Sequence, residues 1–114
     1  MTQYLISFDE GAMQISEEDL PAVTDASVAV VRAAMDAGVW VFGCGLTPRE
    51  GTSVVATDGT VTDAPQPAGK QYLGGFSIVD VPTREEALRW AAEIAVACRC
   101  AQEVRELLPA PDDL

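Results

Sequence analysis

Apolar residues along this chain follow two different spacings. Runs of β-prone residues predict strands at residues 4–8, 72–81 and 100–108. Between them, apolar residues recur every three to four positions at residues 20–34 and 87–98, which predicts two amphipathic helices.

The ends of both helices carry local signals. Ser16, followed by the acidic residues 17–19, predicts the start of the first helix, and Gly38 predicts its end. Thr83, with Glu86 three residues later, forms a capping-box pattern that predicts the start of the second helix.

The strand predicted at residues 39–46 has no polar side. Its two alternating sets are Val39, Val41, Gly43 and Gly45 on one side, and Trp40, Phe42, Cys44 and Leu46 on the other. Such a strand must be covered on both faces, and helices cover only one face of a small antiparallel sheet. We therefore expect a second copy of the chain to cover the other face.

An Asp58-Gly59 pair lies between the β-prone residues 53–57 and 60–62. This pattern predicts a β-hairpin with a tight turn, in which Asp-Gly supplies the positive φ angles. Pro65 and the glycine and proline residues that follow predict an irregular loop at residues 63–69.

The element order is strand, helix, strand, hairpin, strand, helix, strand. This order predicts an α+β fold of the ferredoxin-like βαββαβ type with an inserted β-hairpin. With 114 residues, the chain is long enough for one domain, expected over residues 1–108, and residues 109–114 are expected to form a flexible acidic tail.

The formal net charge of −11 comes from 18 acidic residues against seven lysines and arginines. A phosphate backbone or an anionic membrane surface would repel such a chain, so nucleic acid and membrane are not expected partners. No apolar run approaches the length of a bilayer span, and no secretory leader pattern opens the chain.

The three cysteines are an odd number and do not resemble a secreted disulfide framework, so we expect reduced thiols and a cytoplasmic protein. The chain has no histidine, which removes the commonest general base and metal ligand. No metal site, nucleotide site or other cofactor is predicted.

Residues 63–76, DAPQPAGKQYLGGF, resemble the signature of the DGPF branch of the YCII-related family, which reads Asp-Gly-Pro-Phe, a polar run with lysine, then Leu-Gly-Gly and an aromatic residue. Ala64 and Gln66 depart from this signature. Further similarity covers nearly the whole chain, at Tyr4-Leu5-Ile6, Ala37-Gly38-Val39, Gly45-Leu46, Asp80-Val81-Pro82, Glu86-Ala87-Leu88 and Glu103-Val104-Arg105.

The resemblance implies a ferredoxin-like domain whose sheets pack face to face as a dimeric α+β barrel. Most members of the family carry no assigned reaction. Related proteins have a proposed His-Asp active pair, which this chain cannot form. If the glycine of the family signature adopts a positive φ angle, Ala64 at the same position must either avoid that conformation or accept strain.

Asp63, Lys70 and Tyr72 are the main candidates for chemistry. A carboxylate and an ammonium group at the two ends of one loop could orient a polar ligand, and Tyr72 could donate its phenol hydroxyl. Alternatively, Asp63 binds amides of its own loop, Lys70 is solvated, and Tyr72, like Tyr4, is a core residue with one wet end.

Other candidates have ordinary structural explanations beside the functional ones. Arg49 could bind a carboxylate or a phosphate, or be solvated. Cys98 and Cys100 could form a metal or redox pair or be small packing residues. Cys44 is expected to be inert. Trp40 and Trp90 could floor a pocket or pack in the core or the dimer. The pair Gly74-Gly75 marks either a strand bulge or a close approach by a backbone or ligand.

Three functions remain open. The leading one is a dimeric small-molecule-binding domain, with a pocket between helices and sheet near Asp63, Lys70 and Tyr72. The second is an isomerase or lyase that uses Asp63 as base, with Lys70 or Tyr72 stabilising an enolate. The third is a structural or regulatory module without a pocket.

Overall fold

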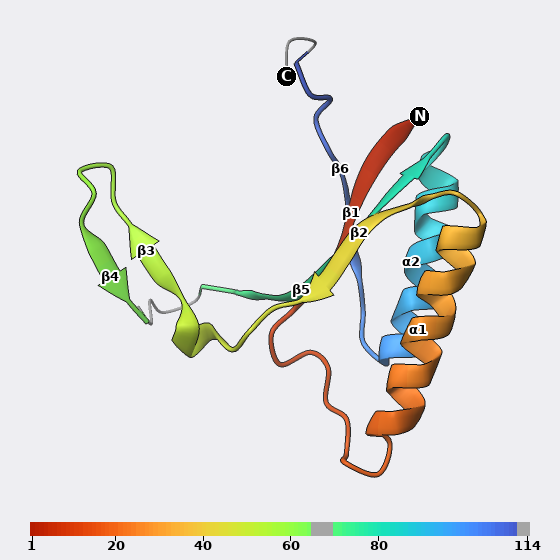
Figure 1. The fold of residues 1–114 in the computed structure, drawn as a ribbon, viewed down its shortest axis with the longest axis horizontal. Helices are drawn as coiled ribbons and strands as arrows, with labels where there is room; N and C mark the ends of the chain where they lie inside the picture. Colours follow the sequence, from red (N-terminus) through yellow and green to blue (C-terminus); the bar gives the residue numbers. More distant parts are fainter. Residues whose placement is uncertain (65–69, 112–114) are drawn as a thin grey trace.

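The protein is described here by a computed structural model that covers residues 1–64 and 70–111. Two helices lie side by side on one face of a sheet, and a hairpin arm projects from the opposite side (Figure 1). In chain order the elements are β1 (Thr2–Asp9), α1 (Leu20–Asp36), β2 (Trp40–Gly45), the short 3-10 helix η1 (Arg49–Gly51), β3 (Ser53–Val55), β4 (Val61–Asp63), β5 (Leu73–Val81), α2 (Arg84–Cys98) and β6 (Glu103–Glu106).

The main sheet has the strand order β2-β5-β1-β6, and every neighbouring pair is antiparallel. This is the ferredoxin-like arrangement, in which the first and third strands of the βαββαβ unit are central. The β3–β4 hairpin forms a separate two-stranded sheet inserted between β2 and β5. The predicted α+β fold is confirmed.

The hydrophobic core lies between the sheet and the helices. Tyr4 and Ile6 of β1 pack with Val79 and Val81 of β5, and small helix residues close over them. The helix residues of this core are Ala34, Ala87, Ala91 and Ile94. Each fully buried aliphatic side chain contributes about 1.5–3 kcal/mol. The alanines add little volume, which limits how completely the core can fill.

The helix boundaries follow the predicted signals with one exception. Gly38 ends α1 with a φ of +75°, and its N–H donates to the carbonyl of Met35. The Thr83 hydroxyl accepts from the N–H of Glu86, as the capping box predicts. However, α1 begins at Leu20 and not near Ser16, because Pro21 has no N–H to bond the preceding turn.

The strand β2 contains a bulge that the alternating pattern did not predict. Trp40 pairs with Val79 and Phe42 pairs with Ile78, so the register shifts across Val41. Trp40 therefore packs against the core on the helix side, while Phe42 lies on the other face. The predicted grouping of Trp40 with Phe42 is wrong, because the extra residue reverses the alternation.

The glycine pair of β5 does mark a bulge. Phe8 pairs with Gly75 and Asp9 with Leu73, which leaves Gly74 as the extra residue. The Phe8 ring lies over both glycines, since a Cβ on Gly75 would be 2.7 Å from Phe8 Cζ. Both the bulge and the close approach are present, and the group that approaches is a side chain.

The turn of the hairpin arm is one residue longer than predicted. Ala56 donates to the carbonyl of Thr60, so the loop holds three residues, and of these only Gly59 has a positive φ. The Asp58 carboxylate accepts from the N–H of Thr60, which lowers the pKa of Asp58. Asp58 stabilises the turn through this bond and not through a positive φ angle.

Ala64, directly after β4, adopts a φ of +47° and donates its N–H to the carbonyl of Thr52. The residue therefore accepts the strain that the family's glycine would avoid. The rest of the predicted loop, residues 65–69, lies outside the described residues, as do residues 112–114 of the predicted tail.

Replacing Ala64 with glycine should stabilise the protein by about 1 kcal/mol, because glycine adopts positive φ angles without steric cost. Urea unfolding measures this change. Ala56→Gly in the same arm is the control: Ala56 has no positive φ, so glycine there should destabilise. A loss of stability in Ala64→Gly would contradict the strain.

Candidate functional site

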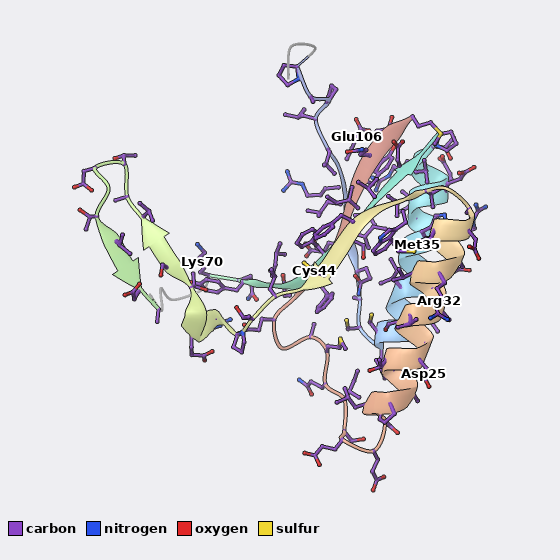
Figure 2. The ribbon with its side chains drawn as sticks, viewed as in Figure 1. Asp25, Arg32, Met35, Cys44, Lys70 and Glu106 are labelled. Carbon is purple, nitrogen blue, oxygen red and sulfur yellow. The ribbon has the colours of Figure 1, made fainter. Side chains whose placement is uncertain are left out.

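Four side chains meet where the hairpin arm leaves the sheet, and we call this cluster the arm root: Glu10, Arg49, Lys70 and Tyr72. Glu10 follows β1, Arg49 opens η1, and Tyr72 precedes β5. Figure 2 shows Lys70 at the base of the arm, away from both helices. The cluster therefore joins three chain segments that are distant in sequence.

Arg49 is held in place by Glu10. One carboxylate oxygen of Glu10 accepts from the backbone N–H of Arg49 at 2.7 Å, and the other accepts from Nε at 2.8 Å. The side chains of this ion pair are about one-third exposed, at 30% and 29%. Such a charge-assisted pair fixes the plane of the guanidinium group.

Two cations lie against one aromatic ring. The Cζ atom of Arg49 is 4.8 Å from the centre of the Tyr72 ring, and Lys70 Nζ is 5.2 Å from it. Both distances fall within the range of cation–π attraction. Glu10, Arg49 and Tyr72 line a hollow of about 200 Å³.

The charge of the arm root differs from that of the chain as a whole. The protein carries only seven lysines and arginines against 18 acidic residues, yet two of those seven meet at Tyr72. Glu10 neutralises one of them. The four side chains of the arm root therefore carry a net charge of +1, in a strongly acidic protein.

Asp63 does not join this cluster by any described contact. Its carboxylate accepts from the Ser53 hydroxyl at 2.7 Å, across the exposed β3–β4 hairpin. The structure thus brings Lys70 and Tyr72 together and engages Asp63 elsewhere. Among the described residues, Asp63 lines neither the hollow nor the larger cavity described next.

A cavity of about 430 Å³ lies between the helices and the sheet. Its described lining is mainly apolar, with five polar or thiol residues: Ser27, Cys44, Ser77, Cys98 and Gln102. The apolar side comes from Phe8, Met13, Val30, Val31, Met35, Trp40, Ile94 and Ala97. Phe76 also borders the cavity beside its pairing partner Cys44, although both positions alternate to the other face of the sheet. Asp63, Lys70 and Tyr72 are not among the described residues that line this cavity, and Tyr72 lines the hollow at the arm root instead.

The cavity exists because several positions around it carry small side chains. Gly45 lines it, and the nearest atom to a Cβ built there is 4.0 Å away. On the helix side, Ser27 Oγ and Cys98 Sγ are 3.6 Å apart, which leaves a weakly polar spot in an apolar wall. The volume falls in the range typical of small-molecule sites.

The cysteines are free thiols. Burial and the neighbouring Cys98 raise the pKa of Cys100, which makes it a poorer nucleophile at neutral pH. Arg99 does not activate a thiol: it forms an ion pair with Asp19 at 2.8 Å. Within residues 1–64 and 70–111, no group of three potential ligands could hold a metal ion.

The aromatic candidates away from the arm root have core positions. Tyr4 is only 4% exposed, and Trp40 and Trp90 pack partly buried against the core. Trp40 also lines the helix–sheet cavity. Trp40 is thus both a core residue and part of a pocket wall.

The sheet face opposite the helices carries a second apolar area. Phe42 and Phe76 are in ring contact there, with centroids 6.1 Å apart. Their pairing partners, Ile78 for Phe42 and Cys44 for Phe76, lie on the same face. Phe42 is 54% exposed in the single chain, so this face is uncovered.

Glu10 is the site residue that the sequence reasoning missed. It lies in a turn after β1, 39 residues before Arg49 in the chain. No local spacing links the two, and the acidic residue next to Arg49 in the sequence is Glu50 and not Glu10.

Together, these features define a small ferredoxin-like α+β domain with a cavity under its helices and an uncovered apolar sheet face. A family model for the YCII-related domain matches residues 3–110, and the chain belongs to this family. No curated protein matches the chain. Neither helix of the described residues is long and apolar enough to cross a membrane.

Proposed function

We propose that this YCII-related domain binds a small organic molecule in the cavity between its helices and its sheet. The observation that carries the proposal is the cavity itself: about 430 Å³, mainly apolar, in a chain with a small core. Burial of a ligand's hydrocarbon part would contribute about 0.8 kcal/mol for each CH₂ group. The few polar groups in the wall would orient the ligand.

The working form is a homodimer packed through the uncovered sheet face. Phe42, Cys44, Phe76 and Ile78 make this face apolar, and water would otherwise contact it. The hairpin arm projects on the same side of the sheet, where a second copy would lie (Figure 1). The Leu-Gly-Gly-Phe residues 73–76 support the assignment to the DGPF branch that we propose, and the three free cysteines suit the cytoplasm.

Binding is favoured over the two alternatives. An isomerase or lyase with Asp63 as base would need that carboxylate beside a ligand, but Asp63 is bonded to Ser53 in the arm. A purely structural module would have no use for a cavity of this size.

Gly45→Val should block ligand binding while leaving the fold intact. The new side chain has room, since the nearest atom to its Cβ is 4.0 Å away, and valine suits a strand. With octanamide and 4-phenylbutyramide as neutral probes, calorimetric titration should show affinity lowered at least about tenfold, because several buried CH₂ contacts are lost.

Thr62→Val on the exposed arm is the matched control, and it should bind like the wild type. Thermal unfolding confirms that both variants fold. Equal binding by Gly45→Val and the wild type would exclude this cavity as the binding site.

A further inference from the structure

The helix–sheet cavity and the arm root are consecutive along two chain segments, those of β1 and β2. Phe8 of β1 lines the cavity, and Glu10, directly after β1, lines the hollow two residues further along, about 7 Å at strand spacing. After β2, Gly45 lines the cavity, while Leu46 and Thr47 line the hollow. The two spaces thus adjoin at one end of the sheet.

Backbone bonding between the β1 and β5 segments continues from one space to the other. Gly75 of β5 pairs with Phe8 of β1, and the Tyr72 carbonyl, just before β5, accepts from the N–H of Glu10, just after β1. Glu10 and Tyr72 therefore lie directly beyond the part of the sheet that borders the cavity.

The join between the two spaces has no side chain to block it on β2. Gly45 is the last residue of β2 and lines the cavity, and the residue after it lines the hollow. No atom approaches closer than 4.0 Å to the place where its Cβ would be. A narrow chain could pass at this position.

The chemistry of the two spaces is complementary. The cavity wall is apolar, whereas the arm root carries Arg49 and Lys70. Glu10 already binds the backbone N–H and Nε of Arg49, which shows that a planar carboxylate fits this place. Among the described contacts, the Nη groups of Arg49 and the ammonium group of Lys70 remain as donors.

We propose that the ligand is an amphipathic carboxylate, with its hydrocarbon part in the helix–sheet cavity and its carboxylate at the arm root between Arg49 and Lys70. This inference rests on the proposed function and names the class of ligand. Because Phe8 and Glu10 are about 7 Å apart at strand spacing, a ligand that reaches from one to the other needs roughly six carbons between its buried end and its carboxylate.

The test compares matched acids and amides by calorimetric titration of the full-length protein. The probes are octanoate with octanamide, and 4-phenylbutyrate with 4-phenylbutyramide. We expect each acid to bind about tenfold more tightly than its amide, with one molecule per chain, because a charge-assisted hydrogen bond is stronger than a neutral one. The difference should shrink as salt is added.

Lys70→Gln should lower the affinity for the acids about fivefold to tenfold and leave that for the amides unchanged. Arg32→Gln, which removes one positive charge from the exposed surface of α1, should change neither (Figure 2). Asp63→Asn at the arm should likewise leave the ratio unchanged or raise it slightly.

The outcomes separate the two proposals. If acids and amides bind the wild type equally, the carboxylate site is wrong and the cavity stands. If Arg32→Gln lowers the affinity for the acids as much as Lys70→Gln does, the preference for acids comes from the net charge of the protein, and the inference is overturned. Two molecules of acid per chain would show separate sites, and no binding by any of the four probes would overturn the cavity as well.

Discussion

Phe42→Glu is expected to dissociate the homodimer that we propose. Phe42 is 54% exposed in the single chain and contacts Phe76 on the uncovered sheet face. A carboxylate placed in an apolar interface loses its hydration and finds no partner, at a cost of several kcal/mol. Because the twofold axis places the change in both subunits, the dissociation constant should rise at least about a thousandfold.

Light scattering over a range of concentrations measures this shift. Val96→Glu is the matched control: Val96 is 81% exposed on the outer side of α2, and the same charge there should leave the dimer intact. A monomer in Val96→Glu together with a dimer in Phe42→Glu would place the interface on the helices and refute the sheet-face assembly.

Features of the fold that depend on one short stretch of sequence could be predicted. Gly38 and Thr83 mark helix ends through bonds to residues three positions away, so the signal and its structural effect lie in one window. The glycine pair at residues 74 and 75 predicted a bulge for the same reason: missing side chains weaken a strand locally.

Features set by packing between distant segments could not be predicted. The bulge at Val41 follows from the fit of the Trp40 ring over Gly43, and alternation alone does not reveal it. Nothing near Glu10 in the sequence indicates Arg49 as its partner. The cavity is lined by residues from several separate elements, so no single sequence motif predicts it.

The candidate site was predicted in part. Lys70 and Tyr72 lie in the segment that resembles the family signature, and the structure places the lysine over the tyrosine ring. Asp63 belongs to the same segment, but residues 65–69 separate it from Lys70 and its described bond is to Ser53. Closeness in sequence therefore grouped Lys70 and Tyr72 in one segment without indicating which side chains meet.

The packing of Trp40 against Gly43 underlies the second large expected effect. Gly43→Ala should destabilise the protein by about 2–3 kcal/mol, as overpacking of a core does. The new Cβ would be 2.6 Å from Trp40 Cη2 and 2.9 Å from the backbone oxygen of Phe76. The strand backbone cannot move away without losing its pairing, so the indole ring must shift.

Gly45→Ala is the control, because it adds the same methyl group two residues later on the same strand. The nearest atom to this methyl group, the backbone oxygen of Gly74, would be 4.0 Å away. It should be neutral or slightly stabilising, since alanine restricts the unfolded chain. Urea unfolding measures both variants. Trp40→Phe should recover part of the loss in Gly43→Ala, because the smaller ring relieves the clash. Independent, additive effects of the two substitutions would show that the ring and the missing side chain are not coupled.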